Sequence, residues 1–248
     1  AILMRLPFVI CGPGPLGLQS GGKMSFVQPV KVKISCIASQ EESRLAVRFG
    51  VTAVGMVDET PSGEGRIPVE TIAEIVQAVP RTTGTFVLTV TTDVDRLEAL
   101  YRTTGVHTIQ LWDPLQPGDY ERLREKAPGI FIAQSVHVVD DAALDTAREI
   151  ARHVDALVLD SVDSETPFRW QNPAGQTHDW EVSRRISEAI HLPILLAGGL
   201  TRDNVGQAIR VVRPYGVDVC SGVRKDGRLD KGLLVAFLEA VSRPSAGF

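Results

Sequence analysis

The stretches Ala197-Gly198-Gly199-Leu200 and Cys220-Ser221-Gly222-Val223 decide the fold of this 248-residue chain. Each is a glycine-containing turn that follows a short apolar run, residues 193–196 before the first and 216–219 before the second. Glycine lets a backbone approach a phosphate closely, and the N–H groups of such a turn can donate hydrogen bonds to it. Two such turns, one βα unit apart and late in the chain, are typical of the phosphate site of a (β/α)8 barrel.

The rest of the chain alternates strand-like and helix-like segments, as a barrel of parallel strands requires. Apolar residues recur at helical spacing in four stretches: 72–79, 144–151, 205–212 and 233–241. A doubly wound open sheet would give almost the same local pattern. The two late phosphate turns, with no glycine motif after the first strand, favour a single (β/α)8 TIM barrel over residues 25–248. The eight predicted strands are 32–36, 53–57, 85–90, 108–111, 130–136, 156–160, 194–197 and 217–220.

Composition excludes several classes of protein. Hydrophobic residues make up 44% of the chain, enough for a sizeable core, and a net charge of −4 argues against a general nucleic-acid binder. No run of eighteen apolar residues is present, so no membrane span is expected. The three cysteines, Cys11, Cys36 and Cys220, fit neither a disulfide framework nor a zinc site, which favours a reducing, cytoplasmic setting.

The first 24 residues differ from the remainder. They contain Pro7, Pro13 and Pro15 together with several glycines, and they show no helical or strand period. The apolar run 8–11 is too short for a good signal peptide, and no A-x-A cleavage site follows it. We interpret residues 1–24 as a leader or extension outside the fold, with Met24 as a plausible native start.

Four blocks, 157–160, 177–180, 196–205 and 216–223, together with Ile109-Gln110-Leu111, resemble the phosphoribosylanthranilate isomerases of tryptophan biosynthesis. The resemblance implies a (β/α)8 barrel without metal or organic cofactor, acting on a small phosphorylated substrate as a monomer or homodimer. It implies an Amadori rearrangement, in which the ribosylamine sugar opens and becomes a 1-deoxyribulose. That reaction needs a general acid for the ring oxygen and a general base for the C2 proton.

The resemblance places the general acid at Asp160. This aspartate ends the apolar strand 156–160, so it should lie at the carboxyl-terminal rim, where barrel enzymes hold their catalytic groups. Partial burial there could raise its pKa toward the working pH. The other interpretation of Asp160 is a helix cap or a residue that anchors a loop.

The general base is the point at which the chain departs from the family. The family reads Val-Lys-Ile-Cys-Gly-Ile-Thr at the first strand, with the cysteine as base, whereas residues 32–38 here read Val-Lys-Ile-Ser-Cys-Ile-Ala. Ser35 therefore stands at the position of the base and Cys36 at that of the glycine. A thiolate is accessible near neutral pH, but a serine alkoxide is not without an activating partner. Strand alternation directs Cys36 outward as a small buried residue, unless the strand end turns there.

The resemblance also suggests residues that contact the substrate. Arg66 would grip the anthranilate carboxylate through its fork of N–H donors, although an arginine in a glycine-rich loop can equally be only solvated. Trp112, which follows Gln110-Leu111, would line an aromatic pocket or cap the rim, and His137 ends a strand and could face the site. The full expectation is Lys33, Arg66, Gln110, Trp112 and Asp218 for the substrate, and Gly175, Gly198, Gly199, Cys220, Ser221 and Gly222 for its phosphate.

Three functions remain open from the sequence. The first is a phosphoribosylanthranilate isomerase, with activity reduced or altered by Ser35. The second is a paralogue that acts on another phosphorylated sugar conjugate, and the third is a phosphosugar-binding protein without catalysis. Asp160 weighs against the third, because a binding protein does not need a general acid.

Overall fold

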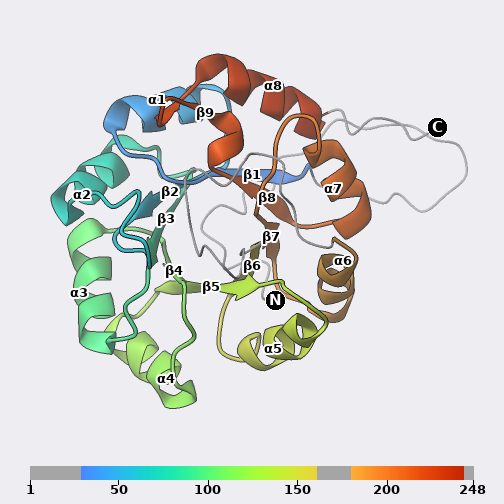
Figure 1. Ribbon diagram of the computed structural model, residues 1–248. Coiled ribbons are helices and arrows are strands. Elements are labelled where there is room, and N and C mark those ends of the chain that lie inside the picture. Colours follow the sequence, from blue (N-terminus) through green and yellow to red (C-terminus); the bar gives the residue numbers. More distant parts are fainter. Residues whose placement is uncertain (1–28, 161–179, 243–248) are drawn as a thin grey trace, which may run out of the picture.

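The barrel forms as the alternation of segments predicts. The structure is a computed structural model that describes residues 29–160 and 180–242. In it, eight parallel strands follow one another in chain order and β1 closes on β8, as Figure 1 shows. The strands are β1 (Lys31–Ile34), β2 (Ala53–Val57), β3 (Gly84–Thr89), β4 (Thr108–Leu111), β5 (Phe131–His137), β6 (Ala156–Asp160), β7 (Ile194–Leu196) and β8 (Gly216–Val219).

Helices surround this barrel on the outside (Figure 1). They are α1 (Gln40–Arg48), α2 (Val69–Ala78), α3 (Val94–Thr104), α4 (Pro117–Lys126), α5 (Ala142–Ile150), α6 (Trp180–Ala189), α7 (Val205–Val212) and α8 (Lys231–Ser242). Local chemistry sets several of their ends. The Ser39 hydroxyl accepts from the Glu42 N–H at the start of α1, and α3 ends at Gly105, whose φ of 67° is left-handed. After β8 come a 3-10 turn, η2 (Ser221–Val223), and a short hairpin of β9 (Arg224–Lys225) and β10 (Arg228–Leu229).

The predicted strands agree closely with those observed, and the closed barrel excludes the open sheet. Three of the eight ranges coincide, and most of the others differ by one residue at one or both ends. The main difference is at β1, which ends at Ile34, so that Ser35 and Cys36 lie beyond the strand. Strand alternation therefore does not apply at Cys36, which matters for the site.

Two of the three apolar clusters in the described residues make up most of the core. The larger packs the outer faces of the strands against the helices, with Ile34, Leu111 and Phe237 among its fully buried members. The smaller fills the inside of the barrel and includes Phe86, Val158 and Leu195. Parallel strands that are buried on both faces have continuous apolar runs, and these runs are the pattern that predicted the strands.

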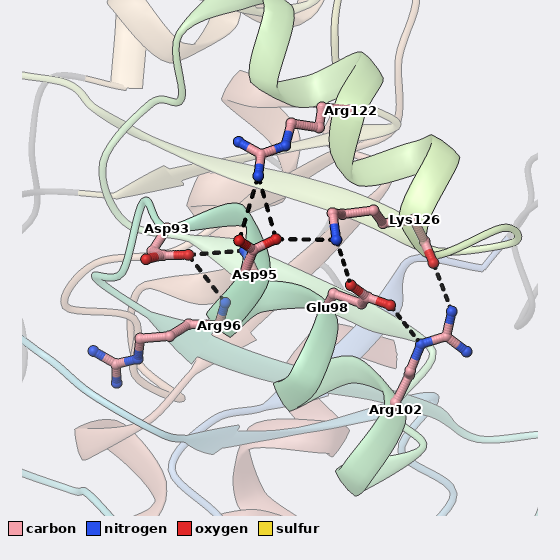
Figure 2. A network of polar contacts seen from close by, with 7 residues as sticks. All are labelled: Asp93, Asp95, Arg96, Glu98, Arg102, Arg122 and Lys126. Atoms are coloured by element: carbon pink, nitrogen blue, oxygen red, sulfur yellow. Dashed lines mark hydrogen bonds and ion pairs between the residues drawn. The ribbon is translucent and has the colours of Figure 1, made fainter.

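A network of charged side chains joins α3 and α4 on the outside of the barrel (Figure 2). The Lys126 ammonium lies 3.0 Å from Asp95 and 3.1 Å from Glu98, and the Arg122 guanidinium lies 3.3 Å from Asp95. The pKa of Asp95 and that of Glu98 are lowered, chiefly by hydrogen bonds from Lys126 and Arg102 respectively. These groups are exposed to solvent and screened, so the network aligns two neighbouring helices without reaching the inside of the barrel.

Some expectations from the sequence fall outside the described residues. The leader 1–24 is one, and Gly175 with the rest of the loop before Trp180 is another. Among the helices of the described ranges, none is long and apolar enough to cross a membrane. Residues 29–160 and 180–242 also contain no cluster of three or more His, Cys, Asp or Glu side chains that could hold a metal ion.

Candidate active site

A buried polar layer lies above the apolar filling of the barrel, centred on Lys33. The side chain of Lys33 is only 2% exposed, yet its ammonium has three acceptors: Asp218 Oδ2 at 2.5 Å, Ser35 Oγ at 2.8 Å and Gln110 Oε1 at 3.0 Å. Gln110 in turn donates through Nε2 to the Ser135 hydroxyl at 3.1 Å. Three donors meeting three acceptors satisfy the charge and leave the layer rigid. The structure thus brings together Lys33, Ser35, Gln110 and Asp218 as expected.

The inner face of β2 makes room for this layer. Gly55 faces Lys33, and a Cβ added to it would lie 3.0 Å from Lys33 Cε and 3.1 Å from Ser35 Oγ. The Lys33 ammonium also lies 5.1 Å from the centre of the Phe86 ring, a favourable cation–π distance. A glycine inside a strand often indicates such a close approach, so this signal was present in the sequence.

The hydroxyl of Ser35 is engaged on both sides. It donates to Asp218 Oδ1 at 2.7 Å and accepts from the Lys33 ammonium at 2.8 Å. A serine becomes a base only when a neighbour takes its proton. Asp218 is also held by the Lys33 ammonium at 2.5 Å, so its carboxylate is shared between the two side chains. Ser35 therefore serves the buried network and is poorly suited to abstract a proton from carbon.

Cys36 does not point outward toward the helices, as simple alternation would have it. Its φ is 64°, in the left-handed region that residues other than glycine rarely adopt. The chain turns at this residue, and the side chain packs with Val57, Leu88 and Trp112 at the carboxyl-terminal mouth of the barrel. The sequence predicted that Cys36 could reach the site only if the chain turns at the end of the strand. The structure has this turn.

The thiol of Cys36 has a second thiol beside it. Both Cys36 and Cys220 are free cysteines, and their side chains are hydrogen-bonded. This hydrogen bond and burial raise the pKa of the Cys36 thiol well above its usual range, while the charge of Arg224 acts in the opposite direction. Cys36 is thus a protonated thiol near neutral pH, and its thiolate forms in the alkaline range.

Asp160 ends β6 at the same mouth of the barrel. It is partly exposed, and in the strand register it lies beside His137 of β5. Both ring nitrogens of His137 are buried, with no hydrogen-bond partner among the residues described, and its ring lies 4.6 Å from that of Trp112. Burial lowers the pKa of His137, so its imidazole is neutral near neutral pH. Asp160, His137 and Trp112 form one wall of the mouth.

The two glycine turns meet backbone to backbone. Gly198 and Gly199 have φ values of 84° and 59°, and a Cβ at Gly222 would lie 2.0 Å from the carbonyl oxygen of Leu200. The N–H groups of Gly198, Gly199, Ser221 and Gly222 make no hydrogen bond to another described residue. Amides that converge on one region without protein acceptors can bind an anion.

Strand order fixes how these groups surround the mouth. Asp160 follows β6, the glycine turns follow β7 and β8, and Cys36 follows β1, which is the next strand around the ring. A substrate whose phosphate lies at the turns would therefore have Asp160 on one side and Cys36 on the other. This arrangement is suited to acid–base chemistry on a phosphorylated sugar.

Among the described residues, one expected residue, Arg66, makes no polar contact with the others. Arg66 is exposed in the loop between β2 and α2, and in the described ranges it makes no hydrogen bond or ion pair with the other expected site residues. Sequence reasoning also missed Arg224 and Glu42, which form an ion pair behind Cys36. Their only signal was a basic residue directly after the second glycine turn, while its partner lies 182 positions away.

Comparison with known proteins agrees with this geometry. The family model for N-(5'phosphoribosyl)anthranilate (PRA) isomerase matches residues 30–240. The N-(5'-phosphoribosyl)anthranilate isomerase of Haloferax volcanii is 35% identical over 212 residues, 85% of this chain and 92% of that protein. The solved structure of phosphoribosyl anthranilate isomerase from Thermococcus kodakaraensis has a TM-score of 0.71 at 30% identity and covers 86% of this chain and 99% of the other.

A further solved structure shares the fold and contains a ligand. It is a phosphoribosyl anthranilate isomerase in complex with reduced 1-(O-carboxyphenylamino)-1-deoxyribulose 5-phosphate. Its TM-score is 0.72 at 23% identity, and it covers 86% of this chain and 98% of that one.

Proposed function

The chain belongs to the N-(5'-phosphoribosyl)anthranilate isomerase family, and we propose that it performs the Amadori rearrangement of that substrate with Asp160 as general acid and Cys36 as general base. The observation that carries the proposal is the left-handed turn at Cys36. That turn brings a thiol to the mouth of the barrel although the family's cysteine position is occupied by Ser35.

Asp160 protonates the furanose ring oxygen. Its place at the end of β6, partly exposed at the mouth, suits a carboxylic acid that must touch substrate and then exchange its proton with solvent. Opening of the ring gives a Schiff base between the sugar and the anthranilate nitrogen. The C2 proton of this Schiff base is then acidic enough for a side chain to remove.

Cys36 removes that proton as a thiolate. A thiol ionises far more readily than the Ser35 hydroxyl, whose proton is already directed at Asp218. Because the pKa of Cys36 is raised, the thiolate fraction is small at neutral pH and grows as the pH rises. Turnover by the wild-type protein is therefore expected to be weak at neutral pH and to increase through the alkaline range.

The phosphate lies at the two glycine turns. The amides of Gly198, Gly199, Ser221 and Gly222 are the donors, and the N-terminal end of α7 adds its dipole. Gln110 and Trp112 contact the remainder of the substrate, and Lys33 with Asp218 holds the buried layer below it. We further propose that the protein works in the cytoplasm, where both thiols stay reduced, as a monomer or a homodimer.

Gly199→Asp is expected to weaken phosphate binding by on the order of tenfold to a hundredfold, the equivalent of one charge-assisted hydrogen bond. The new carboxylate would face the phosphate and repel it, while the positive φ of Gly199 is one that aspartate tolerates. Isothermal titration with the product, or the KM for substrate, measures the effect.

Gly199→Asn is the matched control for this change, because its side chain has the same size and shape as that of aspartate but carries no charge, and it adopts the same positive φ. It should bind clearly better than Gly199→Asp. Equal affinity of the wild type and the Gly199→Asp variant would place the phosphate elsewhere.

Rescue of a tryptophan auxotroph that lacks this isomerase step tests the proposed function in a cell. We expect slow growth without tryptophan when the chain is expressed, and no growth with its Asp160→Asn variant. No rescue by any variant, from a protein that is folded and stabilised by sugar phosphates, would instead indicate a paralogue with another substrate.

A further inference from the structure

Arg224 occupies an unusual place directly behind Cys36. It follows the second glycine turn in β9, and its side chain is only 4% exposed. One guanidinium nitrogen, Nη2, donates to the carbonyl oxygens of both Ser35, at 3.3 Å, and Cys36. The other, Nη1, donates to the Gly227 carbonyl at 3.1 Å. The guanidinium therefore fixes the peptide groups on both sides of the Cys36 α-carbon.

Glu42 holds this guanidinium in turn. Its two carboxylate oxygens lie 3.1 and 3.3 Å from the Arg224 nitrogens, a bidentate pair, and the Glu42 side chain is 13% exposed. The same carboxylate accepts from the N–H groups of Ala38 at 3.0 Å and Leu229 at 2.9 Å. The hydrogen bond from Arg224, with those from the two backbone groups, lowers the pKa of Glu42 although its burial acts in the opposite direction. The pair thus ties the loop after β1 to the loop after β8.

A left-handed conformation at a residue with a side chain persists only where the surroundings impose it. At Cys36 the imposed contacts are the two carbonyls held by Arg224, the Ser35 N–H bonded to Val219 and the Ile37 N–H bonded to Gly55. Only the first of these comes from a side chain, so it is the one that mutation can remove alone.

We propose that Arg224 is a positioning residue of the active site, which holds the Ser35–Cys36 turn so that the thiol of Cys36 faces the mouth of the barrel. The catalytic part of this inference rests on the proposed function of Cys36. The hold on the thiol does not, and it can be measured without turnover.

Electrostatics add to the geometry. The charged and titratable groups that act on Cys36 are Asp218 of β8, Cys220 directly after β8 and Arg224 of β9. The other sides are apolar, with Val57 of β2, Leu88 of β3 and Trp112 directly after β4. Cys220 and Asp218 raise the pKa of the thiol, and Arg224 is the group that lowers it. Removal of the guanidinium should therefore leave Cys36 harder to ionise.

The test measures the rate at which iodoacetamide alkylates Cys36 as a function of pH, with the modified residue identified by peptide mass spectrometry. The midpoint of this curve is the pH at which half of the thiol is ionised. In Arg224→Gln the midpoint should move to higher pH by about one unit, the scale of a neighbouring opposite charge. The kcat should fall by about tenfold with little change in KM, because the misplaced group is the base and the substrate contacts remain. Lys225→Gln, which removes one exposed charge from the next residue, is the control and should change neither quantity.

Arg224→Lys separates the effect of the charge on Cys36 from the effect of the guanidinium on the position of the turn. It also keeps a cation beside Glu42, so that the variant does not unfold because Glu42 is unpaired. Lysine keeps the charge but cannot span two carbonyls and a carboxylate as the guanidinium does. Its alkylation midpoint should stay near that of the wild type while its kcat falls.

The outcomes distinguish this inference from the proposed function. A shifted midpoint in Arg224→Gln supports the action of the guanidinium on the Cys36 thiol even if Cys36 proves dispensable for turnover. An unchanged midpoint in Arg224→Gln with an unchanged kcat in Arg224→Lys overturns it, even if turnover requires Cys36.

Discussion

Asp160→Asn is expected to lower turnover of phosphoribosylanthranilate by on the order of 10²- to 10⁴-fold, the usual contribution of a general acid. Asparagine has the same shape but carries no proton that it can deliver to the ring oxygen. The sugar would then open without assistance, and every later step would wait for it. KM should change little, because the side chain contributes its proton in the transition state more than in the ground state.

The matched control is Asp155→Asn, the same substitution at the amino-terminal end of the same strand. Asp155 accepts from Arg124 at 2.9 Å and from the Ile132 N–H at 2.9 Å, which is a structural role at the amino-terminal end of the barrel. That variant should lose some stability and keep its kcat. Near-normal turnover by a folded Asp160→Asn variant would show that another group protonates the ring oxygen.

The second large effect concerns the base. Cys36→Ala should lower turnover by on the order of a hundredfold, because the remaining Ser35 hydroxyl cannot act as a base unaided. Cys36→Gly removes the same thiol while relieving the left-handed backbone that Cys36 adopts. Equal losses in the two variants would assign the effect to the thiol, because only one of them leaves a strained residue behind.

Ser35→Cys supplies the complementary gain. A thiol at position 35 would lie beside the Lys33 ammonium, which is 2.8 Å from the present hydroxyl and favours a thiolate. Turnover at neutral pH should rise by on the order of tenfold or more, and the double change Ser35→Cys with Cys36→Gly should retain this gain. If Cys36→Ala is as active as the wild type, Cys36 is not the base; if Ser35→Cys also adds nothing, the pocket serves another substrate.

Much of the fold was readable from the sequence because its signals are local. Residues 156–160 form an uninterrupted apolar run ended by a carboxylate, and a parallel strand buried on both faces produces that pattern. The glycine turns could be predicted for a similar reason. Glycine is the residue that most readily adopts a positive φ, as Gly198 and Gly199 do, so the sequence itself indicates the turn. Strand order then placed Asp160 and the turns around one mouth.

The remainder depended on contacts that no local pattern records. Cysteine is not a residue that favours the left-handed region, so the turn at Cys36 could be named only as a condition. One of the groups that hold this turn, the guanidinium of Arg224, is 188 positions away along the chain. Burial of His137 without a described partner likewise follows from its neighbours in space, such as Trp112, which directly follows the preceding strand β4.

The central claim is that this barrel isomerises phosphoribosylanthranilate with Asp160 and Cys36 as its acid and base. The most direct test is the turnover of freshly generated phosphoribosylanthranilate by the purified wild-type protein, followed from neutral to alkaline pH. We expect weak turnover at neutral pH that increases as Cys36, whose pKa is raised, loses its proton. A folded protein that shows no turnover at any pH, or turnover that does not rise toward alkaline pH, would contradict the account.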